Sequence, residues 1–302
     1  MTVQPQVSVV MSAYNTAEYI GAAIDSVLNQ TVSNLELIVV DDGSTDQTAT
    51  VIERYLSSGR VYYKKIENSG SPNARNVGIK MAKAPYIAFI DSDDLWPLDK
   101  LDRQLAIITK VRDTAVLGAV QRFLITETGD RQLLSTSYPP EKLTNTQYLD
   151  ALLSLGLNQM SCFNTILAPT EIIQREGLWD PRFKTAHDWE NWLRLSKALD
   201  FKAIQEPLYF YRKHPTSTTR KNSYSTALRH QINVVDKYVP KGLWGLLKAR
   251  RYKARRYEPF INAAIDDGLR FQAFVVFLRS ISDSNLVFSR SGLRVLKRIL
   301  LG

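Results

Sequence analysis

A chain of 302 residues, 44% of them hydrophobic and 10% aromatic, is long enough for one large globular domain or for one domain with an appendage. The single cysteine, Cys162, excludes an internal disulfide and a cysteine-rich zinc site. The net charge of +9 comes from the C-terminal part. Residues 220–302 carry 17 Lys and Arg against 5 Asp and Glu, whereas residues 1–219 carry 22 against 25.

Neither a membrane-spanning helix nor a signal peptide is expected. No stretch approaches the roughly 18 apolar residues that a spanning helix needs. The N-terminal segment "MTVQPQVSVV" lacks the basic region and the long apolar region of a secretory signal. Together with the single cysteine, these features favour a reducing compartment, and we predict a cytoplasmic protein.

The first hundred residues alternate between strand and helix patterns. Strands are expected over residues 7–14, 35–40, 61–66 and 86–90, the third near a sheet edge because it carries lysines. Helical spacing follows each of the first three strands. The pairs Asn15 with Glu18 and Ser44 with Gln47 have the spacing of capping boxes. This alternation predicts a largely parallel sheet with right-handed crossovers, which is a doubly wound α/β domain.

Further helices and strands are expected after residue 97. They are a helix containing residues 101–108 with Pro97 in its first turn, a strand near 116–125, a helix near 146–155, a strand with a short helix closed by Gly177, and a helix over 187–200. A late strand is expected in "PLYFYRKH", residues 207–214.

Three of the predicted strands end in polar clusters, "SAYN", "DDGS" and "DSDD". Ligands collect at the carboxyl ends of the strands in an open parallel sheet. One acidic strand end is commonly a helix N-cap, but two of them and a third polar end together favour a binding site. Asp91, Asp93 and Asp94 follow a buried strand, and carboxylates suit Mg²⁺ or Mn²⁺. The sequence therefore predicts a cation site that holds a diphosphate.

The segments "VSVVMSAYN", "ELIVVDDGSTDQT", "NARNVGIKMAKAPYIAFIDSDD" and "HDWENWLRL…YRKH" resemble the family 2 glycosyltransferases, which are inverting enzymes with the GT-A fold. The resemblance covers roughly residues 5–215, and the motifs occur in the family's order. It implies a nucleotide-sugar site made of Ser12, Ala13, Tyr14, Asp41, Asp42, Arg75, Asp91 and Ser92. It also implies that Asp93, Asp91 and His214 bind Mn²⁺ or Mg²⁺, and that Asp188 is the catalytic base.

Several of these residues have a simpler alternative. Asp188 is preceded by His187, where the family usually has Glu, and could be an N-cap. Arg75 could form a surface ion pair, His214 could be solvated and Tyr14 could belong to the core. The role of Asp94 is open.

The resemblance implies inverting transfer from a nucleotide-diphosphate sugar, with UDP- or dTDP-sugars favoured, to a hydroxyl of a glycan or lipid-linked acceptor. Cell-surface polysaccharide biosynthesis is the expected context. One alternative is a sugar nucleotidylyltransferase, but that class needs a glycine-rich loop after the first strand, and "SAYNTAEY" has no glycine. The other is a non-catalytic nucleotide-sugar-binding module, which the complete set of acids disfavours.

Residues 1–223 are the predicted GT-A catalytic domain, with a nucleotide-sugar half at about 1–110 and an acceptor half at about 111–223. Residues 224–302 are a predicted helical, basic tail. This tail is either a solvated cap or a set of interfacial helices, with Trp244, Leu246 and Leu247 facing lipid. We predict no nucleic-acid partner, because no recognition motif accompanies the charge. The lipid alternative places the protein peripherally at the inner face of the cell membrane, on an anionic surface.

Overall fold

The computed structural model describes residues 4–125, 130–139, 153, 163–183, 186–214, 224–239, 242–284 and 290–301. The chain forms two compact units. The first comprises Met1–Leu152, Gly156–Pro181 and Asn191–Ser217, and the second comprises Leu153–Leu155, Arg182–Glu190 and Thr218–Gly302. The catalytic domain expected over residues 1–223 stays a prediction. A division of the chain into compact units does not show which residues are needed for catalysis.

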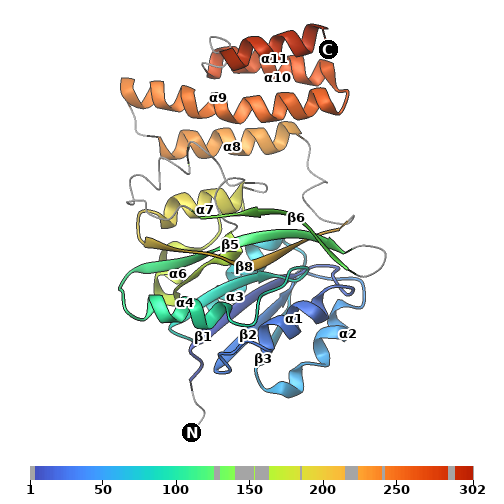
Figure 1. Cartoon of the computed structure of the whole chain (residues 1–302), viewed down its shortest axis with the longest axis vertical. Coiled ribbons are helices and arrows are strands. Elements are labelled where there is room, and N and C mark those ends of the chain that lie inside the picture. Colours follow the sequence, from blue (N-terminus) through green and yellow to red (C-terminus); the bar gives the residue numbers. More distant parts are fainter. Residues whose placement is uncertain are drawn as a thin grey trace. The chain divides into compact units, whose positions relative to one another are not determined.

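The first unit is built on one mixed sheet (Figure 1). Its strands are β1 (Val7–Ala13), β2 (Leu35–Asp41), β3 (Val61–Lys65), β4 (Tyr86–Asp91), β5 (Thr114–Ile125), β6 (Arg131–Ser137), β7 (Leu167–Pro169) and β8 (Asp200–Lys213). The order is β3-β2-β1-β4-β7-β5-β6, and β8 pairs with β5. The pairings of β1 with β2 and β4, of β2 with β3 and of β5 with β8 are parallel, whereas β7 and β6 pair antiparallel. The expected α/β class is confirmed.

The helices of the first unit cover this sheet and follow its strands. They are α1 (Ile20–Leu28), α2 (Thr48–Glu53), α3 (Ser71–Met81), α4 (Lys100–Ile108) and α6 (Thr170–Glu176), and α7 (His187–Leu195) begins in the second unit and ends in the first. Every residue of β1 and β2 is buried, because both faces of the central strands are covered. The helix expected near residues 146–155 lies outside the described residues except for Leu153.

Both predicted capping boxes are wrong. Helix α1 begins after Tyr19 and α2 begins after Gln47, and neither residue makes a side-chain cap. The polar side chains join the two strand-end loops instead. The backbone N–H of Asn15 donates to Oγ of Ser44 at 3.0 Å, and Oδ1 of Asn15 accepts from the N–H of Thr45 at 2.9 Å. The placement of Pro97 in the first turn of α4 is also wrong, because that helix begins at Lys100.

The described residues of the second unit include helices α8 (Tyr224–Tyr238), α9 (Leu243–Asp266), α10 (Arg270–Asp283) and α11 (Arg290–Leu301) (Figure 1). The expected helical C-terminal region is thus present. Its core is formed by Leu228, Ile232, Tyr257, Ile261, Ala264, Ala273, Phe277, Val295 and Ile299. Within the described ranges, no helix is both long and apolar enough to cross a membrane.

Candidate active site

The parallel pairing of β1, β2 and β4 brings three polar strand ends to one edge of the sheet. Ser12 of β1 is opposite Asp91 of β4, and Ala13 is opposite Asp41 of β2. Parallel strands place their carboxyl ends side by side, and these residues accordingly lie next to one another. Tyr14, which follows β1, is 48% exposed, and its reading as a core residue is wrong.

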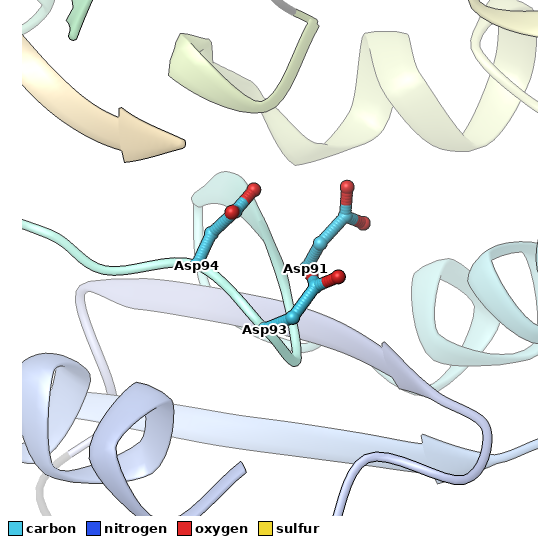
Figure 2. A group of neighbouring side chains, drawn as sticks. All are labelled: Asp91, Asp93 and Asp94. Carbon is cyan, nitrogen blue, oxygen red and sulfur yellow. The ribbon is translucent and has the colours of Figure 1, made fainter. Parts of the chain in front are cut away.

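An acidic cluster occupies the turn that follows β4. Each of Asp91, Asp93 and Asp94 offers a carboxylate oxygen, and these oxygens lie within 4.8 Å of one another (Figure 2). The turn is closed by the N–H of Asp94, which donates to the carbonyl of Asp91 at 3.1 Å. Three negative charges at this spacing repel one another unless cations or hydrogen-bond donors offset them.

Asp91 is held by two donors from different elements. Nη2 of Arg75 on α3 lies 2.6 Å from Oδ1 of Asp91, and Nδ2 of Asn164 lies 2.6 Å from Oδ2. The Arg75 side chain is only 7% exposed, and its guanidinium lies 5.3 Å from the centre of the Trp179 ring. The alternative of a surface ion pair is therefore wrong, because Arg75 is buried beside the acidic cluster.

Asp93 is paired with His214. Nε2 of His214 lies 2.9 Å from Oδ2 of Asp93, and the imidazole lies 4.5 Å, centre to centre, from the Tyr19 ring. The His214 side chain is 7% exposed, so it is not the solvated histidine of the alternative reading. The Asp93 carboxylate remains 27% exposed, so this pair is accessible to a ligand.

Asp94 is fully buried and connects the cluster to β8. Its Oδ2 accepts from the Tyr209 hydroxyl at 2.7 Å, and its Oδ1 accepts from the N–H of Arg212 at 2.8 Å. Burial, and then the charges of Asp93 and Asp91, raise the pKa of this carboxyl well above its usual value. Because both oxygens already bind donors of β8, Asp94 anchors that strand and is a weaker candidate for a ligand than its two neighbours.

The acids at the end of β2 organise the neighbouring loops. Asp41 accepts from the N–H of Ser44 at 2.8 Å and from the Tyr63 hydroxyl at 2.9 Å. The two oxygens of Asp42 accept from the N–H groups of Ser69 and Gly70, each at 2.8 Å.

Ser92, inside the acidic turn, is buried, and its Oγ accepts from the Thr16 hydroxyl at 2.9 Å. The hydrogen bonds of Asp41, Asp42 and Ser92 fix the loops that surround the strand ends. Because a carboxylate oxygen can accept more than one hydrogen bond, the bonds already made by Asp41 and Asp42 do not prevent them from accepting another.

Asp188 belongs to the second compact unit, whereas the acidic cluster belongs to the first. It lies inside the first turn of α7, so it is not the N-cap of that helix. Its side chain is 30% exposed, and Oδ1 lies 3.5 Å from Nε2 of His187. A helix N-terminus favours the ionised form of a carboxylate placed there.

The sequence reading missed Tyr209 and Asn164. The Tyr209 hydroxyl accepts from the N–H of Asp91 and from Nδ2 of Asn164, both at 3.1 Å, and donates to Asp94. Tyr209 lies within the predicted strand "PLYFYRKH", so its strand position could be foreseen but its partners could not. No motif or pattern in the sequence around Asn164 marks it as a site residue.

The α/β fold and the acidic turn at the carboxyl edge of its sheet fit a glycosyltransferase of the GT-A type. The family model described as "Glycosyl transferase family 2" matches residues 8–164. An uncharacterized glycosyltransferase of Rickettsia typhi is 33% identical over 82% of this chain and 73% of its own length. The chain belongs to glycosyl transferase family 2.

Named relatives agree with this membership. The Escherichia coli UDP-Glc:alpha-D-GlcNAc-diphosphoundecaprenol beta-1,3-glucosyltransferase WfaP is 30% identical over 76% of this chain and 85% of its own. The putative teichuronic acid biosynthesis glycosyltransferase TuaG of Bacillus subtilis is 34% identical over 64% of this chain and 73% of its own.

Among solved structures, S. aureus TarS 1–349 has a TM-score of 0.64 at 18% identity, over 98% of this chain and 81% of that chain. TarS 1–349 is also solved in complex with UDP-GlcNAc, with a TM-score of 0.64 at 18% identity, over 92% of this chain and 89% of that chain. The mannosyltransferase PcManGT of Pyrobaculum calidifontis, in complex with GDP-Man and Mn²⁺, has a TM-score of 0.58 at 16% identity, over 99% of this chain and 86% of that chain. At these identities the structures establish the shared fold alone.

Proposed function

We propose that this glycosyltransferase moves a sugar from a nucleotide-diphosphate sugar to a hydroxyl of a glycan or lipid-linked acceptor, with inversion at the anomeric carbon. The observation that carries the proposal is the acidic turn after β4, where Arg75 and His214 are buried beside Asp91 and Asp93. This arrangement combines carboxylates for a cation with a guanidinium suited to a diphosphate.

Asp91, Asp93 and His214 would hold Mn²⁺ or Mg²⁺. The donor set fits such an ion, because the carboxylate oxygens lie within 4.8 Å of one another and Asp91 and Asp93 are partly exposed. When bound, the cation neutralises negative charge on the departing diphosphate. Mn²⁺ in the PcManGT complex supports this choice by analogy of fold.

Tyr14 would stack on the nucleotide base, since its ring is half-exposed beside the strand ends. Ser12, Ala13, Asp41 and Asp42 would line the base and ribose, Arg75 would contact the diphosphate, and Ser92 would keep the acidic turn in place. A uridine nucleotide is favoured over a thymidine one, because the names of WfaP and of a TarS complex include UDP-sugars.

Asp188 would act as the base. Its carboxylate takes the proton of the acceptor hydroxyl as the oxygen bonds to the anomeric carbon, and the bond from that carbon to the diphosphate oxygen breaks on the opposite face. One displacement of this kind inverts the configuration. The name of WfaP, which includes a diphosphoundecaprenol acceptor, supports a lipid-linked acceptor. The name of TuaG, with teichuronic acid biosynthesis, supports a role in cell-surface polysaccharide biosynthesis.

The decisive experiment incubates the purified full chain with UDP-, dTDP- and GDP-sugars in Mn²⁺, Mg²⁺ or EDTA, and measures thermal stabilisation and nucleotide-diphosphate release. One UDP- or dTDP-sugar should stabilise the protein in the presence of metal and be slowly hydrolysed, and EDTA should abolish both effects. Pyrophosphate release from a nucleoside triphosphate and a sugar phosphate would instead indicate a nucleotidylyltransferase. Stabilisation without release, even with added glycan acceptors, would indicate a binding module.

A further inference from the structure

Helix α10 carries an apolar stripe on its exposed side. Phe271 is 79% exposed, and Phe274, Leu278 and Ile281 are exposed as well. These four residues are spaced by three, four and three positions, so they lie along one face of the helix. The same helix uses different residues, Ala273 and Phe277, for the core of the second unit. The stripe is therefore additional to what the packing of the helices requires.

Helices α9 and α11 expose apolar and basic side chains together. On α9, Trp244 is 81% exposed, and Leu247 follows it one turn later. Lys248, Arg251 and Arg255 continue the same face, are all exposed, and have no acidic partner among the described residues. On α11, Leu293 and Leu300 are exposed, with exposed Lys297 between them. Monomeric soluble proteins seldom expose apolar side chains at this density without a partner.

We propose that α9, α10 and α11 form a docking surface for an anionic lipid bilayer. Helices that expose aromatic and leucine side chains beside Lys and Arg bury their apolar atoms at the lipid interface while the cations meet anionic headgroups. A second copy of this chain is a poorer occupant, because residues 220–302 have an excess of 12 basic residues and two copies would repel each other. The proposal goes beyond the transfer reaction and does not depend on it.

The chain contains its own probe for this surface. Of its five tryptophans, Trp96, Trp179, Trp189 and Trp192 are buried, and Trp244 is exposed. A blue shift of tryptophan emission on adding vesicles therefore reports the transfer of Trp244 to an apolar environment. The full chain is titrated with vesicles of phosphatidylglycerol and phosphatidylcholine, and with vesicles of phosphatidylcholine alone, at low and high NaCl and without any nucleotide-sugar.

The blue shift and co-sedimentation are expected only with the anionic vesicles, and both should weaken at high salt. The triple variant K248Q/R251Q/R255Q should bind the anionic vesicles about 100-fold more weakly, because each basic side chain near an anionic surface raises the affinity about fivefold. The matched control K64Q/K80Q/K110Q removes three exposed lysines of the first unit and should bind as the wild type does. The variant F271S/L278S should bind about tenfold more weakly, whereas L133S, an exposed leucine of β6, should not change binding.

Circular dichroism melting curves establish that each variant is folded. Equal binding to neutral and anionic vesicles, or unchanged binding of both surface variants, would overturn the proposal. A dimer seen by light scattering that F271S/L278S dissociates would assign the stripe to a second copy instead. Because no donor is present, failure here is separate from failure of the transfer assay.

Discussion

Nε2 of His214 lies 2.9 Å from Oδ2 of Asp93, although 121 residues separate the two in the sequence. The pairing of β8 with β5 and the bridge between Leu95 and Phe210 bring the end of β8 to the acidic turn. The end of the late strand therefore completes the site that the fourth strand begins.

Replacing Asp93 by Ala should abolish metal-dependent binding of the nucleotide-sugar while the fold is kept. The variant loses one of the carboxylates proposed to bind the cation, and it also loses the partner of His214. Thermal shift with UDP-sugar and Mn²⁺ measures the effect. The control Asp102→Ala removes an exposed carboxylate of α4 and should bind normally. Normal metal-dependent binding by Asp93→Ala would show that the cation is held elsewhere.

Asp188→Asn should lower turnover by roughly 10²–10⁴-fold, since a positioned general base contributes about that factor. Asparagine keeps the size of the side chain but cannot take the proton. Donor affinity should stay within about twofold of the wild type, because the proposed donor contacts come from other residues, and equilibrium titration with the donor checks this. Near-normal transfer, or the joint loss of donor binding and transfer, would remove Asp188 from the role of base.

Glu190→Ala should destabilise the second unit. The Glu190 carboxylate is fully buried, and its Oε1 lies 2.6 Å from both Nζ of Lys237 and the hydroxyl of Tyr238. Removing one partner of such a pair costs about 3–5 kcal/mol when it leaves the other charge without compensation, and less where that charge can reach water, as the partly exposed Lys237 can. Urea unfolding is the measurement. Glu171→Ala, at an exposed carboxylate of α6, should change stability by less than about 0.5 kcal/mol. An equal effect of both substitutions would contradict the prediction.

Lys100 should make stability depend on pH. Its side chain is fully buried, and burial lowers the pKa of its ammonium to about 7. The unfolded chain, with a pKa near 10.4, then binds more protons than the folded one between these values, so Lys100 makes the protein more stable as pH rises from about 7 to about 10. In Lys100→Met this contribution disappears.

The difference in free energy of unfolding between the wild type and Lys100→Met should therefore shift in favour of the wild type by roughly a few kcal/mol between about pH 7 and pH 10. Lys110→Met, at an exposed lysine just after α4, should follow the wild type at every pH. Parallel curves for the wild type and Lys100→Met would disprove the low pKa.

Gly78→Ala should destabilise the first unit by about 1–3 kcal/mol. A Cβ at this position of α3 would lie 2.4 Å from Cγ1 of Val10 on β1, so helix and strand would have to separate. Gly21→Ala is the matched control on α1, because its Cβ would meet nothing closer than 3.5 Å. That substitution should be neutral or stabilising by up to about 1 kcal/mol. Thermal unfolding of the two variants side by side decides the matter.

Local patterns were sufficient for the elements but not for their caps. The strands of the first hundred residues follow from runs of apolar residues, and all four are present close to the predicted limits. The capping boxes failed because Asn15 and Ser44 bond to each other's loops, a contact between segments 29 residues apart. Spacing along the chain cannot distinguish a side chain that caps its own helix from one that bonds to a neighbouring loop.

The sequence by itself determined that Ser12, Asp41 and Asp91 lie at the same edge of the sheet, because parallel strands place their carboxyl ends on one side. Only the tertiary structure decided the roles within the acidic turn. Three adjacent carboxylates look alike in sequence, yet Asp91 binds Arg75, Asp93 binds His214 and Asp94 is buried against Tyr209. The difference arises because α3 and β8 approach the turn from distant parts of the chain, and burial and charge at each carboxylate depend on that approach.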